Sequence, residues 1–454
     1  MTSKIKVNTV ETESGSTLTI GKSGDTVTLA SGASQTGFGR EGSVNWQTTP
    51  KTSTFTAVSG EGYFINSGSA ITMNLPAGSA GAIVAVSDYA RNFATYNLTI
   101  AANGSEKIGG ISNDATLNIN GQAATFVYVD GTKGWVNVQN AEDTETGVSD
   151  FIIATGGTET TSGDFKIHTF TGPGTFAVTQ GGTPCGSNTV DYLVIAGGGG
   201  GAGGKAYNSG TTGGGGAGGY RFSNGTASGS YCAGPAPLGA SALPVSAQNY
   251  PIVVGAGAAA QTCSGPGTPG ITNGIRGSDS SFSTITSTAG GGGIATPGGN
   301  PLAPGGSGGG GNYESPSGGS GNSPPTNPSQ GNNGGNGGSP FLAAGGGGAG
   351  GTGNAGTTGP NTSGSGGNGL ASSITGSPVT RGGGGGGQGS NATNPGGGGP
   401  GGGGAGGSPS TLAGDGTANT GGGGGAANSN PHPSPTTVTG AGGSGIVIIR
   451  YKFQ

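Results

Sequence analysis

Apolar residues recur in short runs between positions 41 and 139, and turn residues such as Pro76-Ala-Gly78 and Asp130-Gly131 separate the runs. This spacing is typical of a β-sandwich or a β-barrel. No stretch of the chain carries the 3.6-residue apolar period of a helix, so we expect an all-β protein. The runs predict strands at 63–65, 71–75, 83–86, 97–100, 116–119, 126–129 and 135–138.

The N-terminal residues 1–40 contain a short repeat. Residues 14–22 read SGSTLTIGK and residues 23–31 read SGDTVTLAS, and in both an aliphatic residue alternates with threonine. Two such strands cannot bury a face alone, because an isolated hairpin is only marginally stable in water. Copies of the chain placed side by side would solve this problem, so we expect a homo-oligomer.

Residues 140–150 concentrate acidic residues without apolar alternation, which predicts a linker. A last domain is then expected over 151–454. Its strand-like runs lie at 151–153, 165–170, 175–178, 192–196, 250–254, 281–287 and 446–451. Between them stand blocks of glycine and five stretches poorer in glycine, which we expect to be projecting loops: 205–212, 221–245, 312–337, 352–380 and 408–420.

The composition of this last domain allows two interpretations. The chain has 114 glycines and 26 prolines without a strict triplet period, a composition that ordinarily indicates disorder. Disordered linkers, however, do not usually carry β-branched strands at their ends. The alternative is an ordered stack of polyglycine-II helices.

A polyglycine-II helix has three residues per turn and no hydrogen bonds within itself. Its amides and carbonyls must therefore find partners on neighbouring segments or in water. Glycine lets such segments approach closely because no Cβ stands between them. Ordering each glycine costs roughly 1–2 kcal/mol of backbone entropy, so the ends of the stack must be held in place. We expect the β-strands at 192–196, 250–254, 281–287 and 446–451 to hold them.

Charge and length limit the class of protein. The net charge is −4 and only 7% of residues are charged, which argues against a nucleic-acid partner because phosphate binding needs clustered Lys and Arg. No apolar stretch approaches the ~20 residues of a membrane span. The N-terminus lacks the apolar core of a secretory signal, so we expect assembly in a cytoplasm. Cys185, Cys232 and Cys263 lack metal-ligand spacing and are odd in number, so we expect small residues or free thiols, with a single disulfide bridge as the alternative.

Catalytic motifs are weak throughout the sequence. The run Gly197–Gly201 satisfies a dinucleotide fingerprint only trivially, because neither a helix nor a suitably placed acid follows. His168 and His432 lack partners at metal-ligand spacing, and His168 is expected to be solvent-facing or structural. We therefore predict no catalytic residue, metal or cofactor. Four carboxylates leave a glycan hydrolase as the enzyme alternative, although their neighbours fit turns better: Asp88, Glu106, Asp114 and Asp130.

Tyrosines within the glycine-poor stretches are the candidate binding residues. Tyr207, Tyr231 and Tyr313 lie in such stretches, and exposed rings favour contacts with sugars and proteins. We predict that these three rings contact a binding partner. The other interpretation is that they only cover the ends of the stack.

The sequence resembles tail-fibre proteins of tailed phages, especially phages of marine bacteria. The resemblance rests on the opening Thr2-Ser-Lys-Ile-Lys-Val-Asn-Thr-Val10 with the repeat and Gln35-Thr-Gly-Phe-Gly-Arg40, and on Gly60-Glu-Gly-Tyr-Phe-Ile65 and Tyr128–Trp135 in the middle block. The last block resembles glycine-rich tail-tip domains through Tyr192–Gly201, Gly214–Arg221 and Gly442–Tyr451.

This resemblance implies a homotrimeric virion fibre without enzymatic activity. Residues 1–40 would attach to a phage tail protein, 41–139 would form a shaft, and the glycine-rich domain would be distal and bind a host cell-surface protein or polysaccharide. Multivalent contacts of this kind can raise avidity by about 10²–10⁴. A glycan-depolymerising tailspike and a purely structural virion or cell-surface protein are the alternatives.

Overall fold

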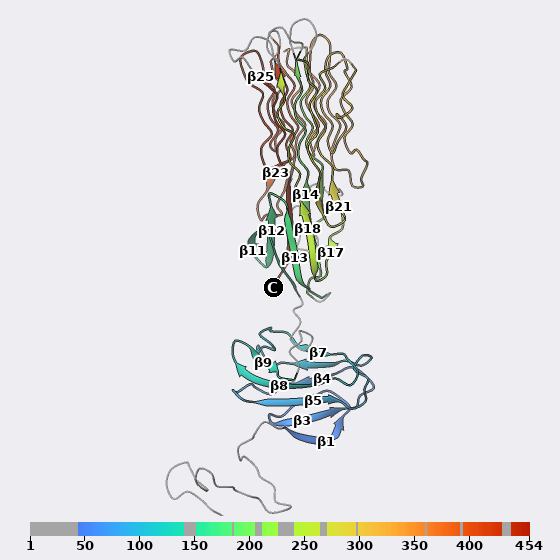
Figure 1. Ribbon diagram of the computed structural model, residues 1–454, viewed down its shortest axis with the longest axis vertical. Coiled ribbons are helices and arrows are strands. Elements are labelled where there is room, and N and C mark those ends of the chain that lie inside the picture. Colours follow the sequence, from blue (N-terminus) through green and yellow to red (C-terminus); the bar gives the residue numbers. More distant parts are fainter. Residues whose placement is uncertain are drawn as a thin grey trace, which may run out of the picture. The chain divides into compact units, whose positions relative to one another are not determined.

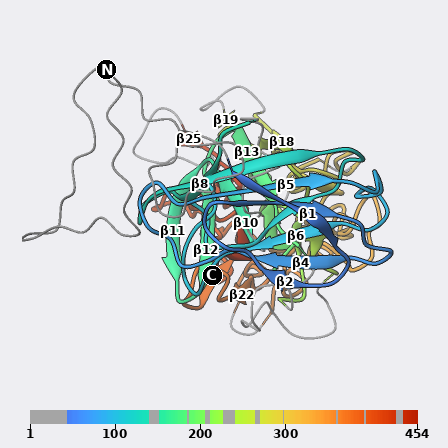
Figure 2. The same cartoon turned by 90° about the horizontal axis from the view of Figure 1, so that it is seen from below.

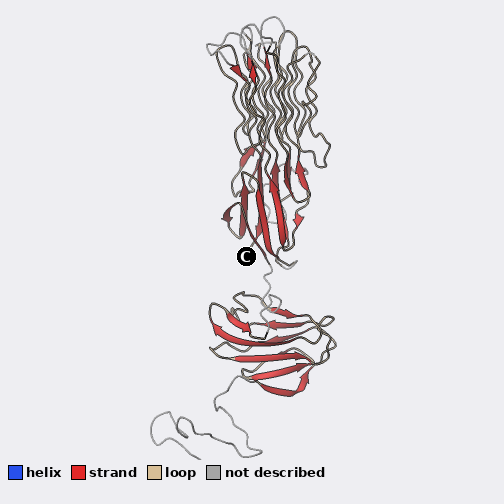
Figure 3. Cartoon of the chain, in the orientation of Figure 1, coloured by secondary structure: helices blue, strands red, loops and turns tan. Residues whose placement is uncertain are grey.

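The computed structural model describes residues 44–139 and 151–454, except for 184–185, 205–210, 226–239, 264–269, 297, 359–360, 391–393 and 429–436. The predicted N-terminal repeat and the predicted linker at 140–150 lie outside the described residues. Every regular element in the described part is a strand (Figure 3), which confirms the all-β prediction. The chain forms two compact units, the first comprising Met1–Gly110 and Thr116–Thr146 and the second comprising Ile111–Ala115 and Gly147–Gln454.

The first unit consists of two facing sheets, whose layers Figure 2 shows from below. One sheet has the order β1-β3-β5-β8-β9, with β1 Asn45–Lys51, β3 Glu61–Ile65, β5 Ile83–Asp88, β8 Ala123–Asp130 and β9 Gly134–Asn137. The other has the order β2-β4-β6-β7, with β2 Phe55–Thr56, β4 Ile71–Asn74, β6 Leu98–Ala101 and β7 Ala115–Leu117.

The chain winds between these sheets. Strands β1, β3 and β5 pair in parallel, as do β2, β4 and β6, because each turn of the chain contributes one strand to each sheet. Strand β8 then pairs antiparallel to β5, and β9 antiparallel to β8. The seven strands predicted in this region are present, and β1 and β2 were missed.

Large side chains fill the space between the two sheets. Trp135, Phe93, Phe126, Met73 and Leu98 are fully buried there. They come from both sheets and from the loop after β5, so the core of the first unit is an interlocked layer of side chains of the ordinary kind.

The second unit begins with a β-sandwich. Its first sheet has the order β10-β13-β18-β20-β21, with β10 Ile152–Thr155, β13 Gly174–Gly181, β18 Gln248–Val253, β20 Ser280–Phe282 and β21 Ile285–Ser287. Its second sheet has the order β11-β12-β26-β14-β16, with β11 Thr158–Ser162, β12 Phe165–Phe170, β26 Ile446–Lys452, β14 Thr189–Ile195 and β16 Tyr220–Phe222. Shorter strands complete the unit: β17 Leu243–Pro244, which pairs with β14, and three two-stranded sheets, β15 Gly203–Gly204 with β24 Ala427–Asn428, β19 Thr262–Cys263 with β25 Thr437–Val438, and β22 Leu370–Ser372 with β23 Val379–Arg381.

The expected strand at 281–287 is instead a tight hairpin. Strands β20 and β21 pair antiparallel, with Phe282 opposite Ile285. Ser283 between them has φ 52°, a left-handed conformation that reverses the chain. The other strands expected to hold the stack in place, at 192–196, 250–254 and 446–451, coincide with β14, β18 and β26. These strands bury Tyr192, Tyr250 and Tyr451 in the sandwich core.

Glycine-rich segments run on from the ends of these strands as a bundle of extended chains (Figure 1). The segment at 196–203, which continues β14, is buried along its whole length. Three stretches expected to be loops contribute segments to this bundle, which we call the glycine array. Residues in 312–337, 352–380 and 408–420 donate backbone hydrogen bonds to other segments of the array, including Gly335 to Gly345, Gly367 to Gly346 and Gly416 to Ala441. These stretches are therefore largely part of the scaffold.

Candidate functional site

The core of the glycine array contains backbone in place of side chains. The amides of the central segment donate to three neighbouring segments and its carbonyls accept from three others. The donated bonds are Gly199 N to Gly216 O, Gly200 N to Ile275 O and Gly201 N to Gly440 O. The accepted bonds are Gly290 N to Gly197 O, Ala258 N to Gly198 O and Gly424 N to Gly199 O. Six segments thus surround the central one.

Hydrogen bonds to any one neighbour recur every third residue. Gly197, Gly200 and Gly203 donate in turn to one segment, through Ser278, Ile275 and Thr272, at 2.9, 2.9 and 2.8 Å. At the array surface, residues 394–400 repeat the same period in their burial. Gly396 and Gly399 are buried, and Gly397 and Pro400 are exposed.

This close packing explains the glycine composition. A Cβ on Gly199 would overlap the carbonyl oxygen of Gly291, and one on Gly215 would overlap that of Gly199. In each case the obstructing atoms belong to backbone, which cannot move aside without breaking the hydrogen bonds. At Gly397, by contrast, a Cβ would meet no atom within 4 Å. Glycine is therefore required inside the array and optional at its surface.

Turns between the segments form the end of the array opposite the sandwich, here called the far end (Figure 1). The Tyr313 ring packs against that of Phe341, with centroids 5.0 Å apart. Phe341 is 39% exposed, and Thr211 Oγ1 donates to its carbonyl at 3.0 Å. Ile271, Leu412 and Val438 are also exposed close to this end.

The described turns of the far end carry one charged residue, Glu314. Of the three tyrosines predicted as contacts, Tyr313 lies at this end. Tyr207 and Tyr231 lie outside the described residues. Phe341 was missed as a candidate because only tyrosines were considered and because it lies outside the stretch 312–337. Large apolar residues between glycine blocks, as in Pro340-Phe341 and Thr411-Leu412, are the signal that could have found such residues.

His168 is structural and completely buried, so the alternative that it faces solvent is wrong. Its Nδ1 lies 2.7 Å from the carbonyl oxygen of Gly156, and its Nε2 lies 3.0 Å from the Tyr451 hydroxyl. Burial lowers the pKa of the His168 imidazole, although the Gly156 carbonyl and Glu159 oppose this shift. Burial also raises the pKa of the Tyr451 hydroxyl.

Three of the four candidate carboxylates bind backbone amides in turns. Asp88 accepts hydrogen bonds from Phe93 and Gly121, and Asp130 accepts them from Thr132 and Lys133. Glu106 accepts from Gly78 and also from the Trp135 indole at 3.1 Å. Among the described residues, no group of three or more His, Cys, Asp or Glu side chains is placed to hold a metal.

Cys263 is a buried free thiol, and burial raises its pKa to about 11. Cys185 and Cys232 lie outside the described residues. The described part of the chain also contains no helix with the length and apolar character of a membrane span.

Comparison with known families finds a match for the glycine-rich part of the chain. A family model described as a glycine-rich domain matches residues 171–452, more than half of the chain, and the chain belongs to this glycine-rich domain family. None of the curated proteins compared with the chain matches it.

Proposed function

We propose that the chain is a receptor-binding tail fibre of a tailed bacteriophage. Its N-terminal segment would attach to a tail protein, and its glycine-rich domain would be distal and would adsorb to a protein or polysaccharide of the host cell surface. Three copies would form one fibre. It would be made in the host cytoplasm and act in the virion, without catalysis.

One observation carries this proposal. The far end of the array carries the paired rings of Tyr313 and Phe341 and the exposed side chains of Ile271, Leu412 and Val438, whereas the described turns there hold a single charge. Binding residues are commonly placed on turns that a rigid scaffold holds in position. Contacts of this kind suit adsorption by several weak interactions multiplied over copies.

We further infer that the segments of the array are polyglycine-II helices. The three-residue period of their hydrogen bonds, seen at Gly197, Gly200 and Gly203, supports this. The burial pattern of residues 394–400 has the same period. A helix with three residues per turn directs successive amides to three different neighbours, which accounts for the six-fold surroundings of the central segment.

The alternative of a glycan depolymerase gains no support from the carboxylates that suggested it, because Asp88, Glu106 and Asp130 already bind backbone amides in turns. Release of reducing sugar from bacterial surface polysaccharide by the purified protein would favour that alternative over a fibre that only binds.

Adsorption of the purified protein to a panel of bacterial strains tests the proposal. We expect the double variant Phe341→Asn, Leu412→Asn to lose most binding to the strain that the wild type recognises. Asn at 341 keeps the left-handed conformation that Phe341 adopts, with φ 59°.

The matched control is the double variant Ile153→Asn, Val253→Asn. It removes two exposed apolar side chains from the sandwich of the same unit, and it should bind as the wild type does. Equal binding by the far-end variant and the wild type would contradict the proposal.

A further inference from the structure

The two sheets of the first unit present chemically different outer faces. Outward residues of the four-stranded sheet are small and mostly polar: Thr56, Thr72, Asn74, Thr99, Ala101 and Thr116. Outward residues of the five-stranded sheet are mostly apolar: Trp46, Phe64, Ile83, Ala85, Ser87, Ala123, Thr125, Val127, Val136 and Val138. We call these surfaces the threonine face and the apolar outer face.

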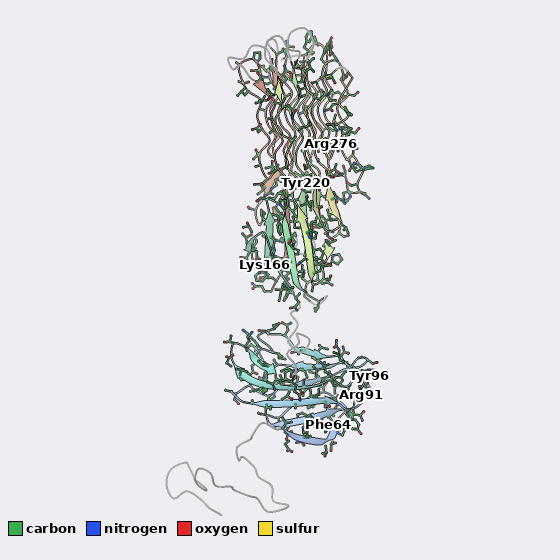
Figure 4. The ribbon with its side chains drawn as sticks, in the orientation of Figure 1. Phe64, Arg91, Tyr96, Lys166, Tyr220 and Arg276 are labelled. Atoms are coloured by element: carbon green, nitrogen blue, oxygen red, sulfur yellow. The ribbon has the colours of Figure 1, made fainter. Side chains whose placement is uncertain are left out.

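Strand pairing assigns these residues to the outer side. Phe64 lies between Tyr63 and Ile65, which are buried in the core, so its side chain points away from the core. Val127 pairs with Val136 across β8 and β9, on the side opposite the buried Phe126 and Trp135. Figure 4 labels Phe64 on this unit.

Aromatic rings extend across one end of the apolar outer face. The ring centroids of Trp46 and Phe64 are 4.9 Å apart, and those of Phe64 and Tyr89 are 6.3 Å apart. Trp46 remains 40% exposed. Its indole lies so close over Gly62 that a Cβ there would approach Trp46 Cε3 to 2.7 Å. Gly62 therefore makes room for the indole against the sheet.

If the apolar outer face met only water, its many apolar side chains would have no explanation. The threonine face shows how this unit covers a sheet that meets water. Three of the ten side chains of the apolar outer face, those of Trp46, Ala123 and Val138, are exposed, and none is charged. A pleated face so rich in aromatic and aliphatic side chains has instead the composition of the buried centre of a protein interface. Val138, at 59% exposure, extends the face beyond the end of β9.

We propose that the apolar outer face of the first unit packs against the same face of further copies of this chain. A second copy of the chain carries the same charges at the same positions. If a charged face packed against the same face of a second copy, like charges would come together, at a cost of several kcal/mol. The apolar outer face carries no charge and avoids this cost. Small ligands are less suitable occupants, because they bind in concave sites and a pleated sheet face is not one.

This inference rests on the proposed function only in that a fibre is assembled from copies of one chain. It concerns a different unit from the far end, so its test does not involve a host cell. If adsorption were to fail and self-association were to hold, the proposed receptor-binding function alone would be rejected.

The experiment measures the solution mass of the full chain by light scattering over a range of concentrations. We expect the wild type to have a multiple of the 42.3 kDa chain mass. A charge buried against a second copy disrupts packing, so Val136→Lys should raise the apparent dissociation constant at least about tenfold. Thr99→Lys on the threonine face is the matched control and should keep the wild-type mass.

Tryptophan fluorescence provides a second readout. The chain has two tryptophans, of which Trp135 is fully buried and Trp46 is exposed on the apolar outer face. Trp46 should be protected from acrylamide in the wild type and become accessible in Val136→Lys, and a Trp46→Phe variant identifies its signal. If Val136→Lys unfolds the unit, Trp135 becomes accessible as well, and Val138→Lys then replaces it because Val138 is exposed in the single chain.

Three outcomes would overturn the proposal. One is a wild type with the mass of a single chain at every concentration. Another is an equal effect, or no effect, of Val136→Lys and Thr99→Lys on the mass. The third is a single chain in which Trp46 is nonetheless protected, which would assign the apolar outer face to another segment of the same chain.

Discussion

The sandwich of the first unit and the glycine array of the second exclude water from their interiors in opposite ways. In the sandwich, Phe126 and Trp135 exclude water with large side chains. In the array, Gly199 and Gly215 exclude it because no side chain separates the backbones, and each amide pairs with a neighbouring segment. One core is therefore sensitive to the loss of atoms and the other to their addition.

The largest expected effect comes from removing atoms in the sandwich. Phe126→Ala should destabilise the first unit by about 3–5 kcal/mol, because a fully buried ring is lost and a cavity remains. Both tryptophans belong to this unit, so denaturation followed by their fluorescence measures the change. The unfolding temperature of the second unit, measured by calorimetry, should not change. A change below about 1 kcal/mol would show that the sandwich core is not packed as described.

Adding one carbon inside the array comes next. Gly199→Ala should destabilise the second unit by about 1–3 kcal/mol or more, because the methyl group meets the Gly291 carbonyl and forces backbone apart. Differential scanning calorimetry measures the change, and the tryptophan transition of the first unit should not move.

Gly397→Ala is the matched control for Gly199→Ala. The new methyl group meets no atom within 4 Å, and alanine restricts the unfolded chain. This variant should therefore stabilise the unit by about 0.4–1 kcal/mol. If both variants destabilised the unit equally, the distinction between the interior and the surface of the array would be wrong.

A smaller, pH-dependent effect concerns the sandwich that anchors the array. Burial holds the pKa of His168 below the 6.5 of an exposed histidine. The unfolded chain therefore takes up a proton first as pH falls, so stability is complete above about pH 6.5 and declines below it.

Melting temperatures between pH 8 and pH 5 test this effect. His168→Gln should flatten the decline relative to the wild type, because glutamine has no titrating group. Parallel curves for the two proteins would contradict a role for His168 in the pH dependence.

The strands were largely predictable from the sequence because their alternation is local. The sequence Ile71-Thr-Met-Asn alternates and forms β4, whose Thr72 lies on the threonine face, whereas the nearly continuous run Phe126-Val-Tyr-Val forms part of β8, which is apolar on both sides. Strand β1 was missed because NWQTTPK is polar and contains proline. Pairing with β3 stabilises it, and such pairing is a tertiary effect.

The partners within the array could not be predicted from the sequence. Gly199 and Gly215 are chemically identical, so no side chain tells which segment each will bind. The contact of Tyr313 with Phe341 likewise depends on how two distant turns meet. The sequence does indicate which segments are interior and which lie at the surface of the array. Unbroken glycine runs such as 197–201 lie inside, whereas Asn333 and Asn336, three residues apart, are exposed on the surface.

Amide hydrogen exchange of the native protein tests the central claim most directly. The amides of Gly198, Gly199, Gly200 and Gly201 each donate to a neighbouring segment, so peptides covering 192–203 should exchange as slowly over their glycine part as over β14. Protection of this kind would require the array to open before exchange. Exchange of these glycines at the rate of an unstructured chain would contradict the account and favour disorder in the glycine-rich domain.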